Sequence, residues 1–599
     1  MLDLLWLIPA IPLASAILLA VLGSRFPRPA VGAIGTGSIG ASAVVAILVA
    51  LSFRGEAFRQ PLWTWIPGMG GFGFYLDALS LVMVVVVTFV SFWIHLYSTE
   101  YMEESEGYSR FFAYMNLFVA SMVTLVLAGN LLLLFLGWEG VGLCSYLLIG
   151  FWYQDPANGR AAQKAFIVTR VGDTAFTIGL LLLFTRLGTL EIQDLMSRAT
   201  AQWPVNSTLA VAAAALLVGG AVGKSAQLPL QTWLPDAMVG PTPTSALIHA
   251  ATMVTAGVYL IARTHALFTL APAVMRAVAV IGAATLLMSG ISALTQVEIK
   301  KALAYSTISQ IGYMFLALGV GAWSAAIFHF MTHAFFKALL FLTAGVVIES
   351  LHHENDIFRM GGMRRYLPVA FWAFLIGGCA LAGLPFVTSG FYSKDLILWS
   401  AWSSDRGATA LWVAGLAGVF LTSLYTFRLI LIVFFGRAEH EISKRPRFAM
   451  TAPLIVLAVL SIIGGFVNVV KFLGTALPPI GEAHGGKSEA LSGAAAAALF
   501  FLGLVTAWLL YARRRPSRAR FRINSWGMDR LYGALFVRPV LWFAAANKSD
   551  AVDKIFGGSA RAAESAWRGM SATETGRVRW YAAGIVGGTV VLLAIAYLV

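Results

Sequence analysis

The sequence predicts an all-α integral membrane protein of about sixteen transmembrane helices, with a lateral amphipathic helix near its C-terminus. Three observations support this fold class. Of the 599 residues, 59% are hydrophobic and only 12% are charged, whereas soluble domains have about 25% charged residues. Apolar runs of about 20 residues, long enough to cross a bilayer, recur along the chain. Two of these runs combine a lysine with a proline, which predicts broken helices.

The apolar runs give the predicted helices in order. They cover residues 2–22, 30–52, 76–96, 111–128, 130–150, 162–185, 208–237 (broken), 245–262, 273–294, 301–320, 323–348, 369–402 (broken), 411–435, 449–469, 490–511 and 578–598. The lysine precedes the proline in helix 7 and follows it in helix 12. That mirrored order predicts two inverted five-helix repeats, helices 4–8 and 9–13. The expected regions are 1–110 (helices 1–3), 111–263 (repeat 1), 264–436 (repeat 2), 437–512 (helices 14 and 15), 513–576 (lateral helix) and 577–599 (anchoring helix).

The charge distribution predicts the orientation in the membrane. The formal net charge is +14, which in a soluble protein would suggest nucleic acid as a partner. Here lysine and arginine concentrate in the loops that follow odd-numbered helices, and the basic run at 512–522 falls on the same side. The positive-inside rule makes that side cytoplasmic, so both termini are expected to face the opposite side. The first helix lacks the basic region that precedes the apolar part of a signal peptide, so it is expected to be retained. Cys144 and Cys379 are too few for a disulfide framework or an iron–sulfur cluster.

Helix 7 contains the most informative stretch, LLVGGAVGKSAQLPLQTWLPDAM. Pro229 removes a backbone donor and should break the helix a short distance after Lys224. In lipid, a broken helix survives only where protein or water satisfies the freed backbone groups. Lys224 is therefore expected to be a buried, titratable amine of the kind that ion and proton carriers use. The alternative is a lysine whose ammonium reaches the membrane surface.

Helices 5 and 6 add three charges within apolar sequence. Glu139 lies in the middle of helix 5 and needs a partner, because an unpaired carboxylate in the membrane is costly. Lys224 is the expected partner. Arg170 and Asp173 are three residues apart in helix 6, so they share a helix face and are expected to form a local pair. That pair could also be purely structural.

Helices 8 and 11 carry histidines. His249 in helix 8 is a weak signal, since a single histidine is usually a hydrogen-bonded core residue. In helix 11, His329, His333 and Lys337 follow one another at four-residue spacing and lie along one stripe. Two histidines at this spacing could bind a metal, but a protonated lysine is a poor ligand and no HExxH pattern completes the site. A hydrated proton relay fits these residue types better.

Helix 12 contains the second expected break, at Pro385 and Gly390. Lys394 and Asp395 follow it directly. With Glu139, Lys224 and Lys337, Lys394 completes a row of ionisable groups that spans both predicted repeats.

Residues 523–576 differ from the rest of the chain, because apolar residues alternate there with charges and alanines. This pattern predicts one or more amphipathic helices lying along a surface, with Pro539 and the pair Gly557–Gly558 as points of bending or interruption. The surface is either the membrane itself or a row of neighbouring subunits.

Several of these stretches together resemble a known family. They are LLFLGWEGVGLCSYLLIGFW, VTRVGDTAF, GKSAQLPLQTWLPDAMVGPTPTSALIHAATMVTAGVYL, KKALAYSTISQIGYM and HFMTHAFFKALLFLTAG. They are similar to the antiporter-like L subunits of bacterial NADH–quinone oxidoreductase, respiratory complex I, over residues 60–440 and more loosely beyond. The same core occurs in the large subunit of multisubunit sodium/proton antiporters. The lateral arm followed by one last span favours complex I.

The resemblance implies roles for the candidate residues. Glu139 and Lys224 would form the acid–lysine pair of a first half-channel, Lys337 would be the central lysine and Lys394 the exit lysine. The expected relay is His249, His329 and His333, and Arg170, Asp173 and Asp395 are expected to modulate the transfer or serve the exit.

The resemblance also implies the chain's setting and partners. The chain would be a proton-translocating subunit without a redox centre in a bacterial inner membrane. It has no glycine fingerprint for NADH, no flavin site and no cluster ligands, so FMN, iron–sulfur clusters and quinone would belong to partner subunits. The expected partners are other membrane-arm subunits and lipid. The rival functions are a cation/proton antiporter and a scaffold subunit that transports nothing.

Overall fold

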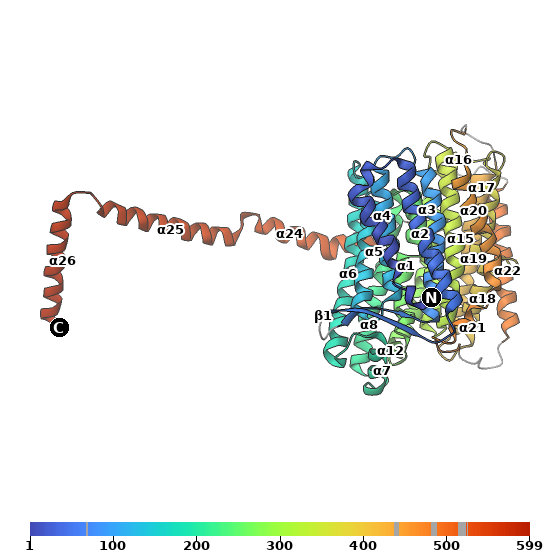
Figure 1. Ribbon diagram of the computed structural model, residues 1–599, viewed down its shortest axis with the longest axis horizontal. Helices are drawn as coiled ribbons and strands as arrows, with labels where there is room; N and C mark the ends of the chain where they lie inside the picture. The colour runs from blue at the N-terminus through green and yellow to red at the C-terminus, as the bar shows by residue number, and fades with distance from the viewer. Residues whose placement is uncertain (67–69, 437–441, 481–487, 513–522, 524) are drawn as a thin grey trace. The chain divides into compact units, whose positions relative to one another are not determined.

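The computed structural model describes residues 1–66, 70–436, 442–480, 488–512, 523 and 525–599. The chain divides into two units, Met1–Ser525 and Trp526–Val599. Both are mostly helical, which confirms the predicted helical membrane fold class. Figure 1 shows the long helices of the first unit side by side, with α16 at one end of the bundle and β1, α7 and α12 at the other.

The elements of the first unit follow in chain order. The first half contains α1 (Leu7–Leu22), α2 (Arg28–Ser52), β1 (Phe58–Ile66), β2 (Gly70–Leu76), α3 (Ala78–Tyr101), α4 (Tyr108–Leu127), α5 (Leu131–Ile149), α6 (Pro156–Leu187), α7 (Ile192–Gln202), α8 (Thr208–Lys224), α9 (Trp233–Asp236), α10 (Thr242–Ala250) and α11 (Ala256–Arg263). The second half contains α12 (His265–Thr269), α13 (Pro272–Thr295), α14 (Ile299–Gly319), α15 (Trp323–Ser350), α16 (Ile357–Met360), α17 (Pro368–Ala382), α18 (Ser389–Ser403), α19 (Thr409–Phe434), α20 (Phe448–Ile463), α21 (Val469–Leu473) and α22 (Glu489–Tyr511).

Thirteen helices in the described part of the chain are long and apolar enough to cross a membrane. The sequence predicted about sixteen spans. The two numbers differ partly because the sequence counted each broken helix as one span, whereas the apolar first half of each is by itself too short to be counted. The shorter apolar helices α8 and α17 are the first halves of predicted helices 7 and 12. The inverted relation of the two repeats stays a prediction.

Both predicted helix breaks are present. Helix α8 ends at Lys224, five residues before Pro229. Helix α17 ends at Ala382. Gly383 follows it with a φ of +84°, the left-handed conformation typical of a helix C-terminus, and α18 begins at Ser389. A third interruption was not predicted. Helix 8 was expected to be continuous over 245–262, but α10 ends at Ala250 and α11 starts only at Ala256. No proline or glycine marks this interruption in the sequence.

The centre of the bundle is formed by α10, α14 and α15. Every residue of α10 is buried, and so is every residue of α15 except Glu349 and every residue of α14 except Lys301. Helix α15 packs against α3, α10, α14, α17, α18 and α20. Because this helix has no lipid-facing side in the structure, each polar group on it must find its partner within the protein.

A two-stranded antiparallel hairpin, β1 and β2, precedes α3. This hairpin was not predicted from the sequence, although its aromatic residues favour strands. Trp63 of β1 stacks on Phe72 of β2, with ring centroids 4.3 Å apart. The turn between the strands lies outside the described residues.

A buried ion pair joins the start of α3 to the end of α11. Asp77 caps α3 through a reciprocal capping box with Ser80. Its carboxylate also accepts two hydrogen bonds from Arg263, at 2.5 and 2.8 Å. Burial raises the pKa of Asp77, but the Arg263 charge and the hydrogen bonds outweigh it, so that its pKa lies below the usual value. The Asp77–Arg263 pair therefore stabilises the end of the bundle that carries the β1–β2 hairpin, as long as both side chains are charged.

The second unit contains α23 (Met528–Tyr532), a π-helical turn (Gly533–Val537), α24 (Arg538–Ala546), α25 (Ala551–Thr573) and the last span, α26 (Val578–Leu598). The amphipathic helices were predicted, but the expected interruption at Gly557–Gly558 was wrong. Pro539 lies in the first turn of α24, where proline is tolerated, and Gly557–Gly558 lies inside α25. The interruption falls at Asn547–Asp550 instead. Of the basic run at 512–522, only Ala512 is among the described residues.

Candidate functional site

The first group of buried charges surrounds the end of α8. The side chains of Lys224 and Asp173 are only 1% and 2% exposed, and Lys224 Nζ lies 3.2 Å from Asp173 Oδ2. The indole Nε1 of Trp138 donates a 2.6 Å hydrogen bond to Asp173 Oδ1. A Cβ atom added to Gly142 would lie 2.6 Å from Lys224 Nζ, so this glycine makes room for the ammonium group against α5.

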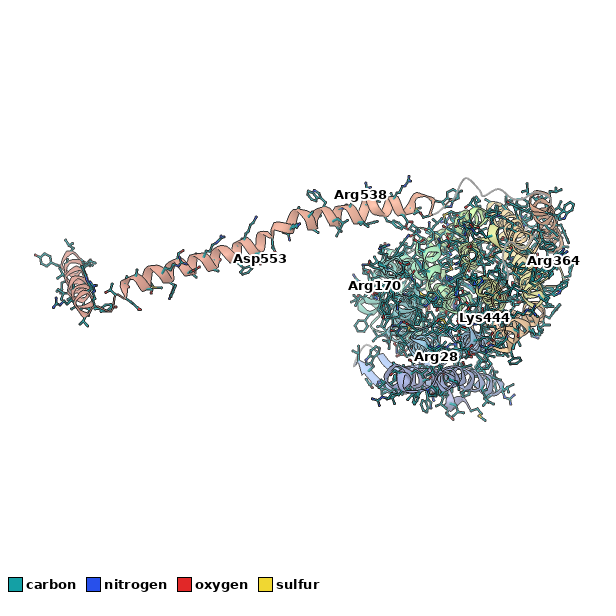
Figure 2. All side chains as sticks on the ribbon, turned by 90° about the horizontal axis from the view of Figure 1, so that it is seen from above. Arg28, Arg170, Arg364, Lys444, Arg538 and Asp553 are labelled. Atoms are coloured by element: carbon teal, nitrogen blue, oxygen red, sulfur yellow. The ribbon has the colours of Figure 1, made fainter. Side chains whose placement is uncertain are left out.

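Glu139 has a different partner from the one that the sequence predicted. Its Oε2 lies 2.6 Å from Arg170 Nη1, and the two side chains are 21% and 43% exposed. Figure 2 shows Arg170 at the edge of the bundle. The expected pairs Glu139–Lys224 and Arg170–Asp173 are therefore corrected to Glu139–Arg170 and Lys224–Asp173.

The physical reason is the direction of side chains on α5. Consecutive helical residues point about 100° apart, so Trp138 faces the buried pair while Glu139 faces outward to Arg170. Glu139 nevertheless stays within electrostatic reach of both Asp173 and Lys224. The four charges form one coupled, net-neutral group.

The break that follows Lys224 contains several buried polar atoms without a protein partner among the described residues. They are Ser225 Oγ, Gln227 Oε1, Gln231 Oε1 and Thr232 Oγ1. The amide of Gln227 also donates to the Ile308 carbonyl of α14 at 3.3 Å. Because unpaired buried polar atoms are costly, this segment is suited to bind water, and it leads from Lys224 toward the central helices.

The second group of charges lies on α15. Lys337 is fully buried, and its Nζ donates to Ser306 Oγ at 2.5 Å and to the Leu303 carbonyl at 3.2 Å, both on α14. The ammonium group of Lys394 lies within electrostatic reach of it. No carboxylate pairs with Lys337 among the described residues, so a proton on it is held by dipoles alone.

The two histidines of α15 continue the row from Lys337. His333 Nδ1 is 3.1 Å from the Ala250 carbonyl of α10. His329 contacts Ser393 Oγ at 2.9 Å and Gln310 Oε1 at 3.2 Å, and the two imidazole centroids are 6.3 Å apart. The stripe that the four-residue spacing predicted is therefore a row of polar groups reaching α18.

His249 lies beside Lys337 at the end of α10. Its ring stacks on Phe341, one helical turn beyond Lys337, at a centroid distance of 5.3 Å. Both ring nitrogens are buried and have no partner in the described part of the protein. His249 is within electrostatic reach of Lys337 and also of Lys300.

Lys394 and Asp395 are adjacent in sequence but face different surroundings. Lys394 donates to the Leu381 carbonyl across the break in helix 12, and its Nζ lies 6.0 Å from the centroid of the Tyr313 ring. Asp395 faces α22, where a Cβ atom on Gly493 would lie 3.3 Å from its Oδ1. Lys394 therefore belongs to the buried row, whereas Asp395 lies outside it.

Several residues of this arrangement were missed by the sequence analysis. Trp138 orients Asp173, Ser306 binds Lys337, and Gln310 and Ser393 bind His329. The signal for two of them was present, since Ser306 and Gln310 recur on one face of an apolar helix. Trp138 reads as an ordinary core aromatic, because its single donor does not affect the hydrophobic pattern. The described residues hold no cluster of three His, Cys, Asp or Glu side chains that could bind a metal.

The chain matches two family models. Residues 128–422 match the family described as "NADH:quinone oxidoreductase/Mrp antiporter, TM", and residues 65–112 match "NADH-Ubiquinone oxidoreductase (complex I), chain 5 N-terminus". The first match contains all ten candidate site residues.

Two relatives are similar over nearly their whole length. The chain is 51% identical to NADH-quinone oxidoreductase subunit L of Pseudomonas aeruginosa, with 97% of each chain covered. It is also 51% identical to subunit L of Escherichia coli K12, with 98% of each chain covered.

Two solved structures are also similar. A chain of the Mrp complex of Dietzia sp. DQ12-45-1b superposes with a TM-score of 0.74 at 26% identity, covering 99% of this chain. This chain spans 63% of the length of that Mrp subunit. A chain of the archaeal membrane-bound sulfane sulfur reductase gives a TM-score of 0.70 at 25% identity, with 82% of this chain and 100% of that chain covered.

Identity of this extent over both whole chains, together with the chain 5 match, shows the family. The chain belongs to the L-subunit family of NADH-quinone oxidoreductase.

Proposed function

We propose that the chain moves protons across a bacterial inner membrane as an antiporter-like subunit of NADH–quinone oxidoreductase. The observation that carries this proposal is the pair of buried lysine groups, one at Lys224 and one at Lys337, joined by polar atoms through the centre of the bundle. A buried ammonium group is stabilised by an anion and loses its proton more readily when that anion is drawn away. Such a group can bind and release a proton within one cycle.

The first group is built for such a change of partner. Asp173 holds Lys224 directly, while Glu139 and Arg170 form a neighbouring pair whose charges reach both residues. A rearrangement that moves Arg170 toward Asp173, three residues away on the same helix, would weaken the hold on Lys224. The proton would then pass along the polar break after Lys224 toward Lys337.

The second group supplies the rest of the path. From Lys337 the proton would pass over His333 and His329, with His249 beside them, to Lys394, and would leave on the non-cytoplasmic side. Asp395 faces α22 rather than the row, so in this proposal it serves the exit. One charge moved against about 100 mV requires roughly 2.3 kcal/mol, which is within the range of one buried ion pair.

The redox chemistry belongs to partner subunits in this proposal. FMN, iron–sulfur clusters and quinone would reside there, and adjacent membrane-arm subunits would contact this chain. The amphipathic helices of the second unit would lie along those subunits, and both chain termini would face the non-cytoplasmic side. Co-purification of flavin- and cluster-bearing subunits with this chain tests the assignment to complex I.

A cation/proton antiporter is the alternative, because the matching family model and the Dietzia relative include Mrp antiporters. Sodium would require several converging oxygen ligands, whereas the titratable groups of the α15 row are one amine and two imidazoles. We expect NADH-driven pumping to continue in sodium-free buffer and to collapse with a protonophore. An absolute sodium requirement would favour the antiporter function.

The scaffold function is tested by neutralising the first lysine. Lys224→Met should reduce proton uptake in NADH-energised vesicles although the complex still assembles, because the titratable amine is lost while most of the side-chain volume remains. Lys471→Met is the matched control, since Lys471 is exposed on α21. Normal pumping by an assembled Lys224→Met complex would overturn the proposed function.

A further inference from the structure

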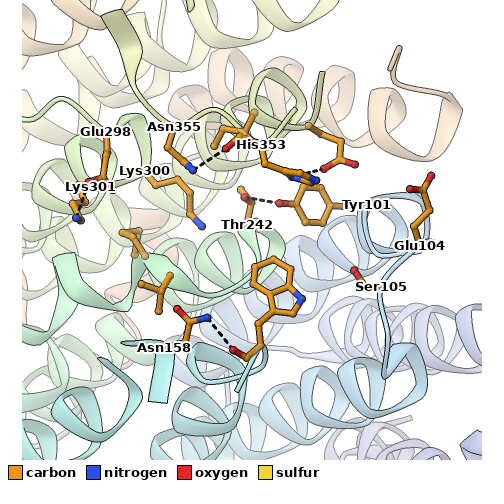
Figure 3. A pocket seen from close by; sticks show the side chains of 15 residues that line it. Tyr101, Glu104, Ser105, Asn158, Thr242, Glu298, Lys300, Lys301, His353 and Asn355 are labelled. Atoms are coloured by element: carbon orange, nitrogen blue, oxygen red, sulfur yellow. Dashed lines mark hydrogen bonds and ion pairs between the residues drawn. The ribbon is translucent and has the colours of Figure 1, made fainter. Parts of the chain in front are cut away.

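A cavity of about 570 Å³ lies at the α16 end of the bundle. It is bordered by Tyr101 at the end of α3, Thr242 at the start of α10, Lys300 at the start of α14 and Glu349 at the end of α15. Figure 3 shows Tyr101, Thr242 and Lys300 around the same space, together with Glu104 and His353. The proposed topology places this end in the cytoplasm. None of the ten candidate site residues lines the cavity.

The rim of the cavity is rich in titratable side chains. Lys444 bridges two carboxylates of the rim, at 3.0 Å from Glu104 and 3.8 Å from Glu349. His353 Nδ1 lies 3.4 Å from Glu349. The side chains of His353 and Glu104 are 73% and 83% exposed. An exposed carboxylate and an exposed imidazole at neighbouring positions can take protons from water and exchange them.

Lys300 lies at the inner side of the cavity. It is 7% exposed, and its Nζ donates a 2.7 Å hydrogen bond to the Gly240 carbonyl just before α10. Its sequence neighbour Lys301 behaves as an ordinary surface lysine, about one-third exposed and paired with Glu298 at 2.8 Å. Lys300 forms no ion pair among the described residues. The Glu298 carboxylate lies within electrostatic reach of Lys300 but is paired with Lys301. A buried lysine without a directly bonded anion is the kind of group that exchanges its proton at moderate cost.

One face of α14 leads from this lysine to the central one. Lys300, Leu303, Ser306 and Gln310 follow at spacings of three, three and four residues, which keeps them on one side of the helix. The Leu303 carbonyl and Ser306 Oγ are the two groups that bind Lys337 Nζ. The axial distance from Lys300 to Ser306 is about 9 Å at 1.5 Å per residue.

Helix α10 provides the opposite wall of the same route. It begins at Thr242 in the cavity and carries His249 seven residues further, about 10 Å along the axis. His249 has two buried, unpartnered nitrogens and lies within electrostatic reach of both Lys300 and Lys337. An imidazole placed in this way can pass a proton between the two lysines, directly or through water.

We propose that this cavity is a separate proton inlet, which loads Lys337 through Lys300 and His249 without passage through Lys224. This inference rests on the proposed function, because it assumes that Lys337 carries protons. The α14 face and His249 form a path of their own, because the Lys224 group lies on α5, α6 and α8; of these helices, α6 contributes Asn158 of its first turn to the cavity wall. The two lysine groups would thus be supplied in parallel.

Two sets of variants in the assembled complex test the inlet. Lys300→Met should lower NADH-driven proton uptake by at least about tenfold, because a positioned proton-transfer group contributes typically about 10²–10⁴-fold, while Lys471→Met stays at the wild-type rate. The cavity can also be blocked chemically after the complex has assembled. Asn158→Cys places a thiol on the cavity wall for this purpose, and Ala157→Cys is the control, because Ala157 is exposed next to Asn158 but does not line the cavity. A membrane-impermeant, cationic thiol reagent should inhibit only Asn158→Cys, and only from the cytoplasmic side.

The outcomes separate the inlet from the function on which it rests. Lys337→Met is measured in parallel as the reference. If Lys337→Met is defective while Lys300→Met and labelled Asn158→Cys both pump at the wild-type rate, the inlet is overturned and the proposed function stands. If Lys337→Met itself pumps normally, the proposed function fails. If Lys300→Met does not assemble, the labelled Asn158→Cys complex decides alone: inhibition supports the inlet and full activity overturns it.

Discussion

Replacing Trp138 by phenylalanine tests the organisation of the Lys224 group without changing any charge. The indole Nε1 is 2.6 Å from Asp173 Oδ1, and the carboxylate is only 2% exposed. A hydrogen bond to a charged group contributes about 1.5–3 kcal/mol, and about 1.36 kcal/mol corresponds to a tenfold change in an equilibrium. Trp138→Phe should therefore destabilise the charged Lys224–Asp173 pair, relative to its neutral form, by roughly 10- to 150-fold.

The assay is NADH-driven proton uptake in inverted membrane vesicles, normalised to the amount of assembled complex and to NADH oxidation with an artificial acceptor. We expect pumping to fall by about tenfold or more in Trp138→Phe. Trp323→Phe is the control for lost core volume, because Trp323 is equally buried at the start of α15 but lies away from the pair. Equal pumping by the two variants would refute the role of Trp138 in positioning Asp173.

Three further predictions concern other parts of the chain. Glu139→Gln should assemble but pump poorly, because it leaves one positive charge unbalanced in the group formed with Arg170, Asp173 and Lys224. Glu139→Asp keeps the charge and should reduce pumping less. Wild-type pumping by an assembled Glu139→Gln complex would contradict the electrostatic coupling within this group. Asp77→Asn leaves Arg263 buried without its anion and should destabilise the detergent-solubilised complex at pH 7 by about 3–5 kcal/mol. The pKa of Asp77 is lowered in the folded state, so the ion pair contributes its full stabilisation above about pH 4 and loses it as the pH falls further. The melting curves of the wild type and of Asp77→Asn should therefore converge at low pH. A difference that stays constant with pH would exclude the ion pair as the cause. Truncation at residue 523 should leave the first unit inserted but weaken its retention in the complex on native gels; full retention with lost pumping would favour a mechanical role for the arm.

The global architecture could be predicted because hydrophobicity and helix breakers are local signals. Runs of apolar residues locate most spans, and Pro229 and Pro385 locate two of the breaks. The interruption after Ala250 could not be predicted, since no local signal marks it; in the structure the Thr252 hydroxyl donates a hydrogen bond to the Leu247 carbonyl at this point. In the same way, Gly557–Gly558 remained helical because a glycine costs a helix only about 1 kcal/mol.

The candidate site was predicted by residue type but not by pairing. Charges in apolar helices identified Glu139, Asp173 and Lys224 as residues that need partners. Which charge meets which depends on helix rotation and on small residues such as Gly142, and neither can be derived from spacing within one helix. The row on α15 was predictable because all three of its side chains lie on a single helix, where four-residue spacing fixes their relative directions.

The most direct test of the account is the ratio of protons moved to NADH oxidised in a Lys337→Met complex. Lys337 is the fully buried amine through which both proposed supplies must pass, so its loss should interrupt this subunit's contribution even when the redox partners still turn over. Proton uptake and NADH oxidation would be recorded together in vesicles whose complex content matches that of the wild type. The account predicts a lower ratio of protons to NADH; an unchanged ratio in an assembled complex would contradict it.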